Sequence, residues 1–186
     1  SAWDTIAGKL GDDPVEELVI ETGEGPDLIP AHPGLDTLDA ELGNIDDAGE
    51  RYSRLTQFLD TYVDPLAYDV ILIDLPGMTN NITYNGLWGA KHAITPVEMG
   101  PFEAEQAEAL TKDIAKFNDN FATDIKVTLV LPNKVDTRTK LSGDYLEVFR
   151  ETYPEAIAPT YVPYSQDIRN AAERGETAFE LESPSK

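Results

Sequence analysis

Apolar and polar positions along the chain follow two different periods, and the two periods alternate. Strand-like apolar runs occur at Tyr68–Asp74, Lys91–Val97 and Ile125–Leu131, with shorter ones at Leu28–Ile29 and Ile157–Val162. A run that is apolar at nearly every position predicts a strand buried on both faces, as in a parallel sheet.

Four other segments carry apolar residues every three to four positions, which predicts amphipathic helices. They are residues 51–63, Pro101–Phe117, Ser142–Tyr153 and Gln166–Arg174, and Gly175 favours the end of the last one. The expected inward-facing residues are Leu55, Phe58, Leu59 and Tyr62 in the first helix, Ala107, Leu110, Ile114 and Phe117 in the second, and Tyr145, Val148, Phe149 and Tyr153 in the third.

The alternation of strands and helices predicts an α/β fold, with a mainly parallel β-sheet and helices on both faces. Residues 1–186 are expected to form a single domain with its own core. In such sheets ligands bind beyond the carboxyl ends of the strands. Asp74, Glu98, Asn133 and Pro163 fall at or just past those ends, so we expect the functional edge of the sheet there.

Charge changes this picture at the level of the surface. The chain has 35 acidic against 14 basic residues, a net charge of −21, and the acids are spread along its whole length. Such a surface suits concentrated salt, because at ~1 M the Debye length is only about 3 Å and self-repulsion is screened. We therefore expect a halophilic host. The alternative is an ordinary acidic protein, or one that avoids nucleic acid.

The absence of cysteine excludes disulfides and thiolate metal sites and fits a reducing cytoplasm. No apolar run approaches the roughly 18 residues that a membrane helix needs. The first residues show no basic start and no apolar stretch of a signal peptide. We expect a cytoplasmic protein without a membrane segment.

Asp74 is the first candidate for chemistry, because it ends an apolar run and is followed at once by Leu75, Pro76 and Gly77. A carboxylate at the tip of a buried strand can hold Mg²⁺, directly or through water, since a hard cation prefers oxygen ligands. An acid in this place can equally be a strand cap or the start of a turn.

A longer pattern is more specific. YDVILIDLPG followed by NITYNGLWGAKHAITPVE resembles the ParA/MinD family of partition and positioning ATPases. The matching residues are Asp74, Pro76, Thr83, Asn85, Leu87, Ile94 and Pro96. The segments DLIPAHPGLDTLDAEL, LPNKVDTRTKLSGDYLEVFRETYP and VPYSQDIRNAAERGETAFE continue the resemblance, which extends from about Trp3 to Phe179. The order and spacing of these pieces carry the resemblance together.

The resemblance implies a P-loop NTPase-like fold with ATP and Mg²⁺ as cofactors. It implies that Asp74 is catalytic and holds Mg²⁺ through water, and that Pro76 and Gly77 form the switch. The adenine base would be bound by Asn133, Pro163, Tyr164 and Ser165.

The resemblance also implies partners: a homodimer in the ATP state, a partition or adaptor protein, and non-specific DNA. Four basic residues of the C-terminal half would contact the DNA, namely Arg138, Lys140, Arg169 and Arg174. The alternative is that these cations form scattered ion pairs in an acidic protein.

One departure from the family is large. Its first strand, its second strand and its Gly-rich loop of the KGGxGKT kind are absent, and Gly8–Lys9 is followed by Leu10 rather than Ser or Thr. We therefore expect an N-terminally incomplete domain that does not hydrolyse ATP by itself. Because the absent first strand would neighbour Tyr68–Asp74, the chain must close its sheet, borrow a strand or expose an apolar edge.

Three alternatives stay open. Asn133–Asp136 reads NKVD, which fits the guanine-reading NKxD motif of GTPases. The chain can also be a non-catalytic interaction module that keeps the fold. The third alternative is a metabolic P-loop enzyme similar to dethiobiotin synthetase.

Overall fold

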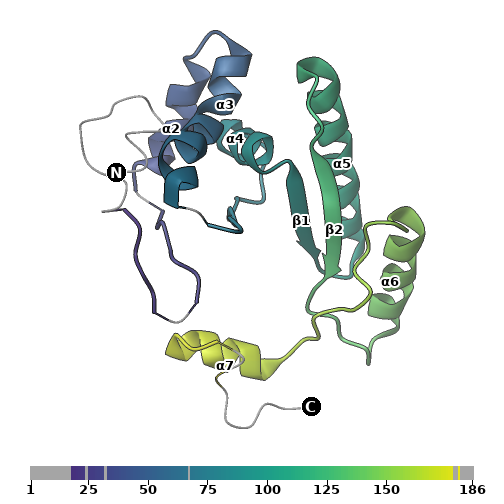
Figure 1. Cartoon of the computed structure of the whole chain (residues 1–186). Helices are drawn as coiled ribbons and strands as arrows, with labels where there is room; N and C mark the ends of the chain where they lie inside the picture. The colour runs from purple at the N-terminus through teal and green to yellow at the C-terminus, as the bar shows by residue number, and fades with distance from the viewer. Residues whose placement is uncertain (1–17, 24, 32, 67, 178–179, 181–186) are drawn as a thin grey trace. The chain divides into compact units, whose positions relative to one another are not determined.

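The computed structural model describes residues 18–177 apart from 24, 32 and 67, together with residue 180. Gly8–Lys9, Trp3 and Phe179 lie outside the described residues. The chain divides into two compact units, the first formed by Ser1–His92 with Phe117–Ile125 and the second by Ala93–Lys116 with Lys126–Lys186. Figure 1 labels the elements of both, and each unit is described by itself.

The first unit is helical in its described part. It contains α2 (Leu35–Gly43), α3 (Ala48–Phe58), a π turn (Leu59–Val63), a 3-10 turn (Asp64–Leu66) and α4 (Asn81–Ala90). The sequence did not predict α2, although Leu35, Leu38 and Leu42 follow a helical spacing. Leu38 and Leu42 are buried and pack with Ile45 and Ile82.

The predicted inward face of residues 51–63 is confirmed. Phe58 is buried in a cluster to which Leu55, Leu59 and Tyr62 belong. A second contact set is aromatic, and Phe117 stacks on Tyr84 with the ring centroids 4.5 Å apart. These apolar contacts explain why three short helices pack together, since isolated helices of this length are marginal in water.

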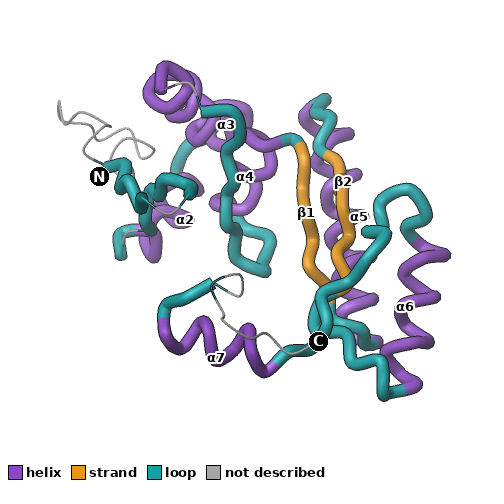
Figure 2. Tube along the Cα trace, turned by 60° about the horizontal axis from the view of Figure 1, so that its bottom comes forward, coloured by secondary structure: helices purple, strands orange, loops and turns teal. Residues whose placement is uncertain are grey.

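The second unit contains the sheet. Strands β1 (His92–Val97) and β2 (Lys126–Pro132) lie side by side in Figures 1 and 2, and their arrows in Figure 1 run in the same direction. The helices are α5 (Pro101–Phe121), whose last turn clusters with the first unit, α6 (Lys140–Thr152) and α7 (Gln166–Arg174). These bounds lie within a few residues of the predicted ones, and α/β architecture with a parallel sheet is confirmed.

The core of the second unit joins strands and helices. Its buried members are Val97, Met99, Ala107, Val130, Val135 and Phe149. Val148 was expected to face this core and instead is 43% exposed. Leu146 packs there in its place, because it and Phe149 share the helix face that Tyr145 and Tyr153 border.

The two shorter predicted strands are reduced to single bridges. Ile157 pairs with Val130 in parallel, and Leu28 pairs with Ile20 in antiparallel orientation. Both segments are extended only where a neighbouring backbone offers hydrogen bonds, such as Ala158 N to Val130 O at 2.8 Å.

The prediction of a buried strand at Tyr68–Asp74 is wrong. This segment, the 68–74 segment below, makes no ladder with any described residue, and the exposed fractions of Val70, Ile71 and Leu72 are 73%, 45% and 82%. A strand is stabilised by backbone bonds to its neighbours, and none is present here. Among the described residues, this exposure agrees with one of the three expectations, an exposed apolar segment.

Among the described residues, no helix combines the length and the apolar character that crossing a bilayer requires.

Candidate functional site

Two loops of the second unit are held side by side at the carboxyl end of β2. Val162 N donates to Pro132 O at 2.9 Å, Val135 N donates to Val162 O at 3.0 Å, and Tyr164 N donates to Val135 O at 3.0 Å. Val135 and Pro163 form a parallel bridge. The structure therefore brings together Asn133 and residues 163–165, which the sequence predicted as one base-binding set.

Asn133 is held through both its backbone N–H and its side-chain oxygen. Its N–H donates to Val97 O at 2.7 Å, which ties the loop to the end of β1. Its Oδ1 accepts from Lys134 N at 3.0 Å, and Lys134 has a left-handed φ of 50°. The Lys134 ammonium pairs with Glu98 at 2.5 Å. Glu98 thus lies at the edge that the sequence predicted, as an ion-pair partner of this loop.

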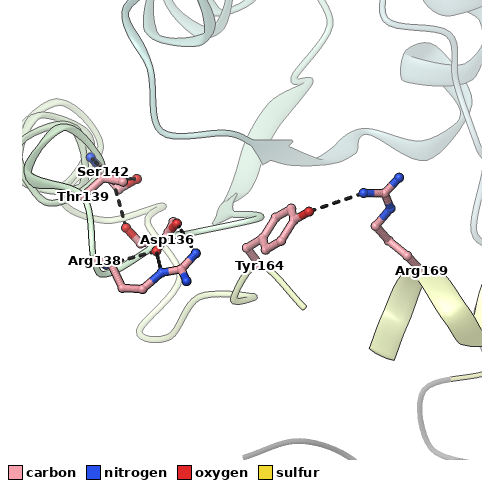
Figure 3. Close-up of polar contacts among 6 residues, drawn as sticks. All are labelled: Asp136, Arg138, Thr139, Ser142, Tyr164 and Arg169. Carbon is pink, nitrogen blue, oxygen red and sulfur yellow. Dashed lines mark hydrogen bonds and ion pairs between the residues drawn. The ribbon is translucent and has the colours of Figure 1, made fainter. Parts of the chain in front are cut away.

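Asp136 is held by Arg138, as Figure 3 shows. Asp136 Oδ1 accepts from Arg138 N at 3.0 Å and from Arg138 Nε at 2.8 Å, and Oδ2 accepts from Arg138 NH2 at 2.7 Å. These side-chain bonds, followed by the backbone bond, lower the pKa of Asp136 to about 2. Both carboxylate oxygens are engaged, whereas a guanine-reading Asp needs them for the base.

The loop before α7 presents one aromatic ring and one hydroxyl. Tyr164 is 49% exposed, and its hydroxyl accepts from Arg169 NH1 at 3.3 Å (Figure 3). Ser165 is the N-cap of α7, and its Oγ accepts from Asp167 N at 3.2 Å. Pro163 is exposed next to them. This segment offers exposed ring surface in the loop that pairs with the Asn133 loop.

The four predicted DNA contacts are divided between two places. Arg138 and Lys140 lie at the start of α6, and Arg169 and Arg174 lie on α7. Arg138 pairs with Asp136, and Arg174 lies 3.7 Å from Glu176. These pairs fit the alternative of scattered ion pairs, and DNA binding stays a prediction.

Asp74 lies in the first unit, exposed at the end of the 68–74 segment, and Pro76 and Gly77 follow in an exposed bend. Its carboxylate suits Mg²⁺ held through water. The described residues contain no group of three or more His, Cys, Asp or Glu side chains that could hold a metal. That Asp74 and Asn133 share one sheet edge stays a prediction, since they belong to different units.

The family resemblance includes Thr83 and Asn85 without giving them a role, and it does not include Gly86. Thr83 and Asn85 are buried polar side chains of α4, with 5% and 2% exposed. The available signal was their polarity at positions where an amphipathic helix needs apolar residues.

Comparison with known proteins shows the family of the chain. Residues 4–127 match the AAA_31 family, described as an AAA domain. The chromosome partitioning protein ParA of Myxococcus xanthus is 29% identical over 157 residues, covering 83% of this chain and 53% of that protein. The sporulation initiation inhibitor protein Soj of Bacillus subtilis is 24% identical over 163 residues, covering 88% and 62%. The chain spans about half to two thirds of the length of these relatives.

Solved structures show the same fold at low identity. The apo McdA of Cyanothece has a TM-score of 0.80 at 18% identity, covering 97% of this chain and 71% of that one. The cobyrinic acid a,c-diamide synthase of Mycobacterium smegmatis, with bound ADP and magnesium, has a TM-score of 0.72 at 22% identity, covering 95% and 74%. A putative plasmid partition protein of Borrelia burgdorferi, bound to AMPPNP, has a TM-score of 0.71 at 16% identity, covering 97% and 66%. The fold is that of the ParA-like P-loop NTPases.

Proposed function

The chain belongs to the AAA_31 family of AAA domains, and we propose on this premise that it is the greater part of a ParA-type ATPase of partition or cargo positioning. The observation that carries the proposal is the pairing of the Asn133 loop with residues 163–165 beyond the end of β2. In parallel α/β sheets this is where nucleotides bind. The names of the relatives supply the biological process.

Three residues of the paired loops would hold the base in this proposal. The Asn133 amide offers its Nδ2 as a donor to a base edge, while its Oδ1 already accepts from Lys134 N, and Pro163 and Tyr164 supply a surface for the ring. Adenine is favoured over guanine because Arg138 occupies both oxygens of Asp136. The NKVD sequence therefore does not serve as a guanine motif in this proposal.

In this proposal Asp74 is the acid that orients Mg²⁺ and water, and the Pro76–Gly77 turn is the switch. The 186 residues include no KGGxGKT sequence to cradle the phosphates. We expect these residues alone not to hydrolyse ATP. With a phosphate loop supplied, we expect a cytoplasmic ATP-dependent homodimer that works with a partition or adaptor protein and with non-specific DNA.

Calorimetry tests the proposal. At micromolar protein, the 186-residue chain should give no heat of binding with ATP and Mg²⁺. A polypeptide in which a strand and a KGGxGKT loop precede residue 1 should bind ATP more tightly than GTP and hydrolyse it. A tight Mg²⁺-dependent isotherm from the 186-residue chain would reveal a phosphate site elsewhere, and an extended polypeptide that binds neither nucleotide would refute the ATPase proposal.

Matched variants of the extended polypeptide assign the roles. Asp74→Ala should abolish hydrolysis and leave the fold intact, because the exposed acid acts on the metal. Asp69→Ala removes an exposed acid from the same segment and should keep full hydrolysis. Asn133→Ala should weaken ATP binding about tenfold, the effect of one lost hydrogen bond to a buried base. Asn120→Ala, on the exposed face of α5, should not.

One observation favours a second candidate, the non-catalytic interaction module. Val70 and Leu72 are largely exposed in a segment that no described residue pairs with. Such a segment can accept a strand from another polypeptide. A stable complex of the 186-residue chain with a strand-forming partner, together with no nucleotide binding by the extended polypeptide, would select this candidate.

A further inference from the structure

The loop that carries Asp74 is anchored on α4 by an apolar contact at its start. Leu75 lies directly over Gly86: a Cβ added at residue 86 would lie 2.5 Å from Leu75 Cδ2, 2.9 Å from Cδ1 and 3.2 Å from Cγ. Any side chain at position 86 therefore displaces Leu75 from this place. Leu75 directly follows Asp74 in the chain, so we expect a shift of Leu75 that reaches its backbone to change the position of the acid.

A second anchor, at Met78, lies three residues further along the loop, and it is polar. The buried hydroxyl of Thr83 donates to Met78 O at 2.5 Å. Thr83 N donates to Asn80 Oδ1 at 2.9 Å, which makes Asn80 the N-cap of α4. The Thr83 side chain thus fastens the end of the loop, and the Pro76–Gly77 turn lies between the two anchors.

The helix that bears both anchors is itself firmly held. The Asn85 amide bridges two backbone groups of α3, donating to Arg51 O at 2.9 Å and accepting from Leu55 N at 3.1 Å. Asn81 N donates to the Asp39 carboxylate of α2 at 2.7 Å. These bonds give α4 a fixed position relative to α2 and α3, so the loop is attached to a rigid support.

We propose that Thr83 and Gly86 are positioning residues that set the conformation of the loop 74–80 through Met78 and Leu75, and thereby aim the Asp74 carboxylate. The functional importance of this orientation rests on the proposed function, in which Asp74 binds the metal through water. Thr83 and Gly86 themselves touch neither metal nor nucleotide. The competing role for both is purely structural, as small residues that let α4 pack.

Backbone ¹⁵N relaxation of the 186-residue chain separates the two roles. Order parameters are about 0.85 for rigid backbone and below about 0.6 for flexible backbone. Thr83→Val keeps the shape of the side chain and removes the hydroxyl, so residues 77–79 should fall to below about 0.6 while the amides of α4 stay near about 0.85. Thr83→Ser keeps the hydroxyl and should restore the loop.

The apolar anchor has its own test with a matched control. Gly86→Ala should abolish the nuclear Overhauser contact between the Leu75 methyl groups and residue 86 and shift the Asp74 carboxyl resonance. Gly89→Ala adds the same methyl group to the same helix, where its nearest neighbour is Thr56 Oγ1 at 3.4 Å, and should change neither. These readouts need no nucleotide, so they stand or fall independently of the ATPase assignment.

Three results would overturn the proposal. One is an unchanged loop in Thr83→Val, and another is loss of order along the whole of α4, which is what a structural role predicts. The third is an Asp74 resonance that responds equally to Gly86→Ala and Gly89→Ala.

Discussion

Single residues matter most in this protein where a polar group is shut away from water. Asn85 is 2% exposed and uses both atoms of its amide, with a third bond from Nδ2 to Asn81 O at 2.9 Å. Each bond taken alone is modest, but an unpaired buried group costs about 1–3 kcal/mol. The sequence shows an Asn in a helix, and only the packing of α4 on α3 shows why it is there.

Asn85→Ala should lower the free energy of unfolding by about 2–4 kcal/mol, because it leaves Leu55 N and Arg51 O without their bonds. Urea denaturation followed by circular dichroism measures this. Asn120→Ala, on the helix surface, should stay within about 0.5 kcal/mol of the parent chain. A loss below about 0.5 kcal/mol for Asn85→Ala would show that water replaces the amide.

Asp136 should show its contact with Arg138 in a pH titration. Since the folded pKa of about 2 lies below the ordinary value of 3.8, the pair stabilises the fold above pH 3.8 and this contribution disappears as the pH falls through 2. In the Arg138→Gln variant, which keeps the backbone bond, the carboxyl ¹³C resonance of Asp136 should titrate at a higher pH than in the parent chain. The same midpoint in both proteins would contradict the ion pair.

At the scale of elements, neighbours decided which apolar segments became strands. Ile125–Leu131 was predicted as a strand and is one, because β1 and the backbone around Ile157 bond to it. The 68–74 segment also contains a run of apolar residues and is not a strand. The difference lies outside both segments, in the presence or absence of a hydrogen-bonding partner.

Because the 68–74 segment is exposed, we expect it to tolerate polar substitutions of its apolar residues. Val70→Thr with Leu72→Thr should change the free energy of unfolding by less than about 0.5 kcal/mol and reduce aggregation, since both side chains face water. Val130→Thr, at a site 1% exposed, should cost about 1–3 kcal/mol. Urea denaturation and light scattering measure the two effects. A cost above about 2 kcal/mol for the double variant would mean that the segment is buried in solution.

At the scale of the whole molecule, charge and division into units dominate. The net charge of −21 acts on every part of the surface and disfavours the compact state through self-repulsion. The chain also separates into two units, with the 68–74 segment in one and β2 in the other. Both features depend on interactions across the whole chain rather than on any local motif.

Salt should therefore raise the thermal stability. Raising KCl from 0.1 M to 1 M shortens the Debye length from about 10 Å to about 3 Å and screens the repulsion. We expect a higher Tm by circular dichroism in molar KCl, with sucrose at equal osmolarity giving a smaller rise. Equal Tm values from 0.1 to 3 M KCl would remove the basis for a halophilic host.

DNA binding by the 186-residue chain should be absent at moderate salt, because the acidic surface repels the phosphates. Retention on a duplex DNA column measures this. If the chain is retained on the column, and if Arg169→Glu or Arg174→Glu weakens that retention, the cations of α7 take part in DNA binding. Arg150→Glu, whose parent pairs with Glu147 on α6, serves as the control.

The sequence by itself determined the local features of this protein. Hydrophobic period and capping residues located α5, α6 and α7, and Gly175, with its left-handed φ of 71°, ended the last helix as predicted. The loops at Asn133 and at residues 163–165 were also identified as one set, because strand ends collect at one edge of a parallel sheet. These are properties that short stretches of chain carry within themselves.

Tertiary structure alone decided the rest. The 68–74 segment is exposed, Asp136 is held by Arg138, and Leu75 lies over Gly86, each through groups that the pattern of a single segment does not specify. A strand needs a partner's backbone, a carboxylate needs a particular cation, and a glycine is needed only where another side chain approaches. Sequence patterns record what a residue prefers, whereas its partner is set by the folding of the whole chain.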